Sequence, residues 1–132
     1  MRIHRVLALF AACALAGCAT KPAAIQHVVL ISLQDPSGRE ALLQDCNRLL
    51  PHIPTVKSWW CGVPGDFGRS SVDDDYDVAL CAGFADGPGY LAYLVDPAHV
   101  ELVQTWKPKF NWIRIHDVVD PPDTPSNYNG GS

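Results

Sequence analysis

Three side chains that could transfer protons stand out in the sequence: His27, Tyr93 and His99. A neutral imidazole accepts a proton near pH 7, and a phenol can donate a hydrogen bond to a developing enolate. Together they suit proton transfer next to an enolisable carbonyl group. Each also has a structural interpretation, which is the more common one, because buried polar side chains usually form hydrogen bonds within the fold.

Other kinds of reactive site have little support in the sequence. There is no His-x-His, Cys-x-x-Cys or His-Glu-x-x-His pattern, so we expect no metal site. The acidic run at 73–75 lacks the glycine spacing of a calcium loop and is typical of a solvated loop. No glycine-rich phosphate loop or Gly-x-Ser-x-Gly motif is present, and we expect no cofactor. A net charge of −4 argues against a basic face that binds nucleic acid.

The elements that would position these side chains follow from the hydrophobic periodicity. Strands are expected at 25–33, 55–63, 76–84 and 110–119, and helices at 39–50, 86–94 and 98–106. The order β-α-β-β-α-β predicts a ferredoxin-like α+β subunit with its helices on one face of the sheet. A domain this small gains by covering the bare face with a second copy, so we expect a homodimer that forms a dimeric α/β barrel.

Alternation along the strands indicates which side chains face the helices. His27 shares one face of the first strand with three apolar residues, and Tyr93 and His99 flank Pro97, which interrupts the helical stretch. We therefore predict an apolar pocket in which His27, Tyr93 and His99 are the polar groups. The predicted apolar lining is Val29, Ile31, Leu42, Cys46, Val78, Leu80, Ile113 and Ile115.

Four segments carry a family resemblance: QHVVL at 26–30, IP at 53–54, YDVAL at 76–80 and, most specifically, YLVDPAHV at 93–100. Together they resemble the stress-responsive α/β-barrel domain family, abbreviated Dabb, over about residues 25–119. The resemblance implies a dimeric α+β barrel of ferredoxin-like subunits. Some plant members are polyketide cyclases, and their acid–base Tyr and His fall where Tyr93 and His99 stand here.

The first residues have the pattern of a bacterial lipoprotein signal peptide at 1–17. Residues 2 and 5 are arginines, and the apolar run at 6–16 spans roughly 16 Å, about half the bilayer core. The LAGC motif at 15–18 matches a lipobox, so we predict lipidation of Cys18 and a lipidated tether at 18–24. The alternatives are an ordinary signal peptide or a buried first helix. Ala19 resembles the outer-membrane sorting pattern, which predicts the inner leaflet of the outer membrane, facing the periplasm.

The other end of the chain is rich in proline and glycine, so we expect a flexible tail at 120–132 and one folded domain at 25–119.

Three cysteines fall within that domain. Cys61 and Cys81 lie on adjacent predicted strands, so a disulfide between them is one option in an oxidising compartment. Cys46 is expected to be a small buried hydrophobic residue.

Two functional hypotheses of different classes follow. The first is a membrane-anchored dimer that binds a small apolar ligand or an envelope partner without catalysis. The second is a cofactor-independent cyclase, lyase or monooxygenase-like enzyme that uses His27, Tyr93 and His99 on a hydrophobic carbonyl or phenolic compound. The sequence favours the first, because it shows no decisive catalytic motif and a widely reused fold does not set function. A common cavity for Tyr93 and His99 would favour the second.

Overall fold

The computed structural model describes residues 23–119 of the chain. The predicted signal peptide at 1–17, Cys18 with the first part of the tether, and the predicted tail at 120–132 lie outside the described residues. Within the described part, no helix is long and apolar enough to cross a membrane.

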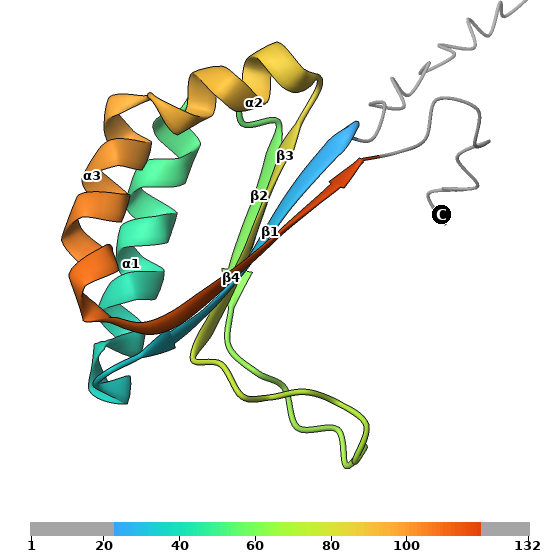
Figure 1. Cartoon of the computed structure of the whole chain (residues 1–132), viewed down its shortest axis with the longest axis vertical. Helices are drawn as coiled ribbons and strands as arrows, with labels where there is room; N and C mark the ends of the chain where they lie inside the picture. Colours follow the sequence, from blue (N-terminus) through green and yellow to red (C-terminus); the bar gives the residue numbers. More distant parts are fainter. Residues whose placement is uncertain (1–22, 120–132) are drawn as a thin grey trace, which may run out of the picture.

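Four strands and three α-helices make up the described chain, in the order β1 (Ile25–Leu33), α1 (Arg39–Leu49), β2 (Ser58–Gly62), β3 (Val78–Phe84), α2 (Gly87–Leu94), α3 (Pro97–Trp106) and β4 (Phe110–Val119). The sheet is antiparallel with the strand order β2-β3-β1-β4. All three helices lie on one side of this sheet (Figure 1). The predicted ferredoxin-like α+β fold of the subunit is therefore confirmed.

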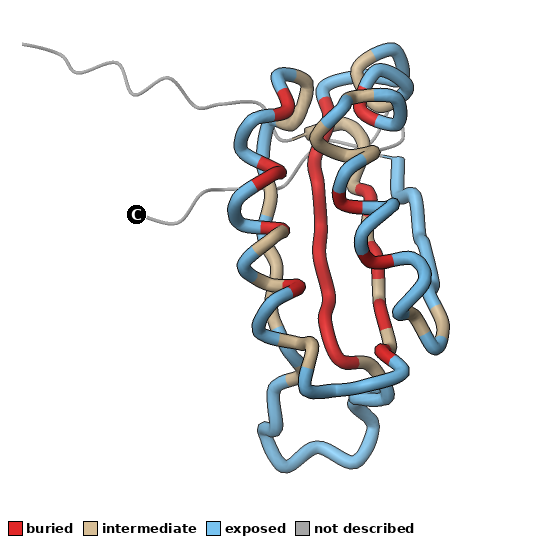
Figure 2. The backbone as a smooth tube through the Cα atoms, turned by 90° about the vertical axis from the view of Figure 1, so that its left-hand side faces the viewer, coloured by how far each residue is buried: buried red, intermediate tan, exposed pale blue. Residues whose placement is uncertain are grey.

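The core lies between the sheet and the helices. On β1 the buried residues alternate, with Val29, Ile31 and Leu33 facing the helices, whereas the central strand β3 is buried at every residue (Figure 2). The helices contribute Leu42, Cys46, Leu49, Leu102 and Trp106 to this core. Burial of apolar surface on one face of the sheet is what fixes the register of β1 between its two neighbours.

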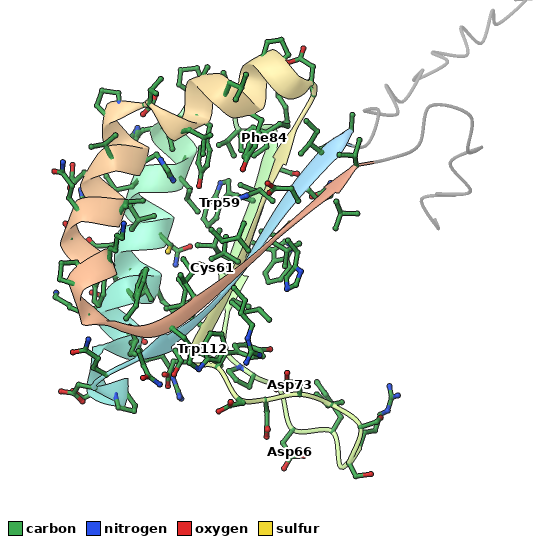
Figure 3. All side chains as sticks on the ribbon, in the orientation of Figure 1. Trp59, Cys61, Asp66, Asp73, Phe84 and Trp112 are labelled. Carbon is green, nitrogen blue, oxygen red and sulfur yellow. The ribbon has the colours of Figure 1, made fainter. Side chains whose placement is uncertain are left out.

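The second strand differs from the prediction: β2 covers 58–62 rather than 55–63. The Val56 N–H donates to the Ile53 carbonyl at 3.1 Å, which closes a turn instead of extending the strand. The segment after β2 runs beyond the sheet as an exposed loop that carries Asp66 and Asp73 (Figure 3). Among residues 23–119, no group of three or more His, Cys, Asp or Glu side chains is placed to hold a metal ion.

A buried carboxylate, Asp77, ties the start of β3 to two other elements. Its oxygens accept hydrogen bonds from the Leu33 N–H at 2.8 Å and from the Arg39 guanidinium at 2.8 Å. The Leu33 N–H, followed by Arg39, lowers the pKa of Asp77 below its usual value against the opposing effect of burial. Asp77 therefore stays ionised and joins β1, β3 and the first turn of α1.

The disulfide considered between Cys61 and Cys81 is not present. Both residues are free thiols, and the register pairs Cys61 with Leu80 and Cys81 with Trp60. Because directly opposed residues share a face and neighbours along a strand do not, Cys61 faces the helices and Cys81 faces the other side. The bond that the sequence left open is therefore absent, since the two side chains lie on opposite faces of the sheet.

Candidate active site

A cavity of about 310 Å³ lies between the helices and the sheet. Its wall brings together all three predicted polar side chains and most of the predicted apolar ones. The predicted residues that line it are His27, Val29, Ile31, Leu42, Leu80, Tyr93, His99, Ile113 and Ile115. Ile113 and Ile115 are 44% and 52% exposed although they line the cavity, so the cavity opens to solvent along β4.

Two predicted lining residues, Cys46 and Val78, do not reach the cavity. Both are completely buried in the core. Cys46 is a buried residue of α1, and Val78 is the first residue of β3, opposite Ile31. Both belong to the core cluster as expected, but neither is part of the cavity wall.

The wall also includes residues that the sequence reasoning missed. They come mainly from the two later helices and the segment that follows them: Tyr90, Leu94, Leu102, Val103, Trp106, Lys107 and Phe110. Helical spacing could have found several of them, because Tyr90 precedes Tyr93 by three residues and Leu102, Val103 and Trp106 follow His99 by three, four and seven.

The break between α2 and α3 brings Tyr93 and His99 together. Asp96 caps α3 by accepting a hydrogen bond from the Ala98 N–H at 2.9 Å, and Pro97 occupies the first helical position. The change of helix direction places the His99 ring 4.1 Å from the Tyr93 ring, measured between centroids. The two side chains are thus in contact on the cavity wall.

His99 is held in one tautomer by the backbone. Its Nδ1 lies 3.1 Å from the Leu94 carbonyl oxygen. Because a carbonyl only accepts, Nδ1 carries the proton and Nε2 of the neutral ring has the free lone pair. Burial lowers the pKa of His99, and the neighbouring His27 lowers it further, while the Leu94 carbonyl opposes both. His99 is therefore a neutral proton acceptor at pH 7.

Tyr93 has the opposite character. Its side chain is among the largest that are fully buried, and it contacts the rings of His99, Phe84 and His27. Burial raises the pKa of Tyr93 well above the usual value, and the nearby Cys46 and Tyr90 act in the same direction. The phenol therefore keeps its proton and serves as a hydrogen-bond donor.

A second cluster joins His27 to Asp117 and Tyr90. His27 and Asp117 are directly opposed on β1 and β4, and His27 Nδ1 lies 2.6 Å from Asp117 Oδ1. The Tyr90 hydroxyl donates to Asp117 Oδ2 at 2.9 Å. With Asp117 as the acceptor, Nδ1 of His27 carries a proton, and in the neutral ring Nε2 is the acceptor.

The charges within this cluster follow from its hydrogen bonds. Burial raises the pKa of Asp117, but the hydrogen bonds from His27 and Tyr90 outweigh it and leave the pKa below its usual value. Burial, together with the neighbouring Asp117 carboxylate, raises the pKa of Tyr90 to about 12. Asp117 is thus the anion that orients His27, and Tyr90 is a neutral donor to that anion.

Neither Asp117 nor Tyr90 was predicted as a site residue. The alternation of β4 contains a signal for Asp117, because residues 113, 115 and 117 share the face that lines the cavity. A carboxylate on the apolar, helix-facing side of a strand needs a hydrogen-bond partner. That partner, His27, is identified only once the register between β1 and β4 is known.

The chain belongs to a known domain family. The model of the Stress responsive A/B Barrel Domain family matches residues 25–120. No curated protein sequence matches the chain. The family model covers the whole of the described fold, including every residue of the two polar clusters.

Several solved structures share the fold. A Dabb family protein from Mesorhizobium loti is 25% identical, with a TM-score of 0.62 and coverage of 74% of this chain and 96% of that one. A dimeric ferredoxin-like protein of unknown function from Thermobifida fusca is 23% identical, with a TM-score of 0.61 and coverage of 73% and 90%. A hydroxynitrile lyase from Passiflora edulis is 17% identical, with a TM-score of 0.66 and coverage of 80% and 100%.

Proposed function

We propose that this member of the stress-responsive A/B barrel family is a cofactor-independent enzyme that moves a proton on a small apolar carbonyl or phenolic compound. The observation that carries the proposal is the contact between Tyr93 and His99 on the wall of one apolar cavity. The neutral His99 imidazole, which can accept a proton, and the Tyr93 phenol, which can donate one, thus line the same cavity. The fold also houses at least one enzyme, the Passiflora edulis hydroxynitrile lyase.

The chemistry assigns one role to each side chain. His99 Nε2 takes a proton from the carbon next to the carbonyl, or from a phenolic hydroxyl. Tyr93 donates a hydrogen bond to the oxygen on which negative charge develops. The proton held by His99 then returns to a different atom of the product or to a leaving group. His27, oriented by Asp117 and Tyr90, offers a further polar contact within the cavity.

Exchange of substrate protons with solvent tests this proposal without knowledge of the natural substrate. A panel of small apolar carbonyl compounds is incubated with the protein in D₂O, and deuterium next to the carbonyl is measured by mass spectrometry. We expect the protein to accelerate exchange in the compounds that it binds. Compounds that bind in the cavity but exchange no faster than in buffer would contradict the proposal.

A second candidate is binding without catalysis. It is favoured by the hydrogen bonds that His27 and His99 already make within the protein, to Asp117 and to the Leu94 carbonyl. A wall that is mainly apolar suits storage or transport of a small hydrophobic compound equally well. Saturable binding with no exchange in any compound of the panel would establish this candidate in place of the enzyme.

The setting that we propose is the cell envelope, on the basis of the lipobox. Residues 1–17 would be removed and Cys18 would carry the lipid, which would anchor the domain on the inner leaflet of the outer membrane. The tether would leave the cavity free to meet its ligand in the periplasm.

We further propose that the domain is a homodimer that pairs through the helix-free face of the sheet. Trp60 and Val118 are 54% and 55% exposed on this face, and Leu30 lies between Ala79 and Arg114 at its centre. The similar protein from Thermobifida fusca is dimeric. A second copy would cover apolar surface that none of the helices within residues 23–119 covers.

A further inference from the structure

Two free thiols, Cys46 and Cys61, meet between α1 and β2. Cys61 Sγ lies 3.5 Å from Asn47 Oδ1 and 4.0 Å from the Leu43 carbonyl oxygen. Leu43 precedes Cys46 by three residues and Asn47 follows it directly, and Cys61 packs against the core cluster that contains Cys46. Figure 3 shows Cys61 on the helix-facing side of the sheet. Nothing in the proposed reaction uses either thiol.

We propose that Cys46 and Cys61 are a redox pair that forms an intramolecular disulfide linking α1 to β2. The inference rests on three features together: the Cys61 sulfur reaches α1 on either side of Cys46, both cysteines pack in the same core cluster, and both are free thiols. A disulfide requires two cysteines whose side chains approach in this way. Cys81 has no such access, because it lies on the other face of the sheet.

Burial determines the order of the steps. Cys61 is half-buried and Cys46 is completely buried, so an external oxidant reaches Cys61 first. The Cys61 thiolate attacks a small-molecule or protein disulfide, forms a mixed disulfide and releases one thiolate. Cys46 then loses its proton and attacks the Cys61 sulfur, which releases the second thiolate. The protein gives up two protons and two electrons, and the oxidant disulfide is reduced to two thiols.

The second step controls the rate. Burial, aided by the neighbouring Cys61, raises the pKa of Cys46 to about 12, so little thiolate is present at neutral pH. Thiol–disulfide exchange proceeds through the thiolate, and formation of the bond is therefore expected to accelerate as the pH rises. A mixed disulfide on Cys61 accumulates before the intramolecular bond at neutral pH.

The bond would act on both stability and the cavity. It ties the loop from 46 to 61 closed, which restricts the unfolded chain. Leu42 lies four residues before Cys46 on the same helix face and belongs to the cavity wall. Oxidation would thus hold the part of α1 that shapes the cavity against the edge of the sheet.

Tryptic peptide mapping tests the pair directly, because the three cysteines of the domain fall in three different peptides. Cys46 is in the peptide 40–48, Cys61 in 58–69 and Cys81 in the peptide that begins at 70. The full chain is oxidised with excess oxidised glutathione at mildly alkaline pH, remaining thiols are alkylated in denaturant, and the digest is analysed by mass spectrometry. We expect the peptides 40–48 and 58–69 to be linked, and the link to disappear on reduction.

Matched variants complete the experiment. Cys81→Ala should keep the link and Cys61→Ala should lose it, while oxidation of the wild type should raise Tm by on the order of 10 °C. The proposal is overturned if Cys46 and Cys61 both remain alkylatable after oxidation, or if Cys61 is linked to Cys81. The peptide map of the wild type does not depend on whether any variant folds.

Discussion

Asp117 determines how two other side chains meet the cavity. Its two oxygens accept from His27 and from Tyr90, so one carboxylate orients an imidazole and a phenol at once. This arrangement needs the carboxylate to be ionised, and the hydrogen bonds that it accepts keep it so. An orienting carboxylate of this kind sets the tautomer of a histidine rather than reacting itself.

The lowered pKa of His99 predicts a specific pH dependence for proton exchange. Only the neutral ring accepts a proton, and the folded-state pKa lies below the usual histidine value of about 6.5. We therefore expect exchange activity to be retained as the pH falls to about 6.5 and to decline only at lower pH. The measurement is the pH–rate profile of exchange for one bound carbonyl compound.

A pH–rate profile with its midpoint above the usual histidine pKa would contradict the assignment of His99 as the base. Loss of fold at low pH is separated from loss of the base by circular dichroism on the same samples. Binding of the compound, measured at each pH, separates both from loss of affinity.

The break between α2 and α3 is the element that assembles the pair. Asp96 and Pro97 start α3 in a new direction shortly after α2 ends at Leu94, whose carbonyl accepts a hydrogen bond from His99 across the break. Removal of the cap should therefore affect the site as well as the helix.

We expect Asp96→Ala to cost about 1 kcal/mol of stability and also to slow exchange, because α3 loses its fixed start. Asp35→Ala is the matched control, since Asp35 caps a short helical turn before α1 in the same way but does not line the cavity. Thermal unfolding and exchange rates are measured on both variants. Equal exchange rates in the two variants would show that the cap does not position His99.

Some elements of this fold can be predicted from the sequence more closely than others, and the reasons are physical. The boundaries of β1 and β4 follow from sequence because their apolar patterns are long and regular. β2 starts later than the sequence predicts, since a local turn at Ile53–Val56 competes with the strand. The partners of His27 and Cys61 depend on strand register and on how α1 crosses the sheet, and neither is encoded in local periodicity.

At the scale of the whole molecule, the helix-free face of the sheet predicts the oligomeric state. We expect the chain without its predicted signal peptide to sediment as a dimer at micromolar concentration. Leu30→Glu places a charge at the centre of this face and should yield a folded monomer, because an unpaired charge in an interface is costly. Leu91→Glu on the exposed, helical side should remain dimeric.

A wild-type protein that sediments as a monomer would contradict the proposed pairing. So would a Leu30→Glu variant that remains dimeric. Circular dichroism on each variant establishes that the subunit itself is folded.

The lipobox makes a separate prediction about where the molecule resides. If Cys18 carries the proposed lipid, its replacement in Cys18→Ser should abolish acylation and release the protein from membranes in a bacterial host. The measurement is the distribution of the protein between membrane pellet and supernatant. Unchanged pelleting of this variant would refute the anchor and leave the proposed activity untouched.

The most direct test of the proposed function is the exchange rate of one bound compound in four proteins: wild type, Tyr93→Phe, His99→Gln and the double variant. General acid–base groups contribute about 10²- to 10⁴-fold, so each single variant should slow exchange on that scale. Because the two groups act on one proton transfer, their effects on the exchange rate should not multiply. The double variant should exchange at a rate close to that of the slower single variant. Single variants that bind the compound and exchange its protons as fast as the wild type would contradict the proposed roles of Tyr93 and His99.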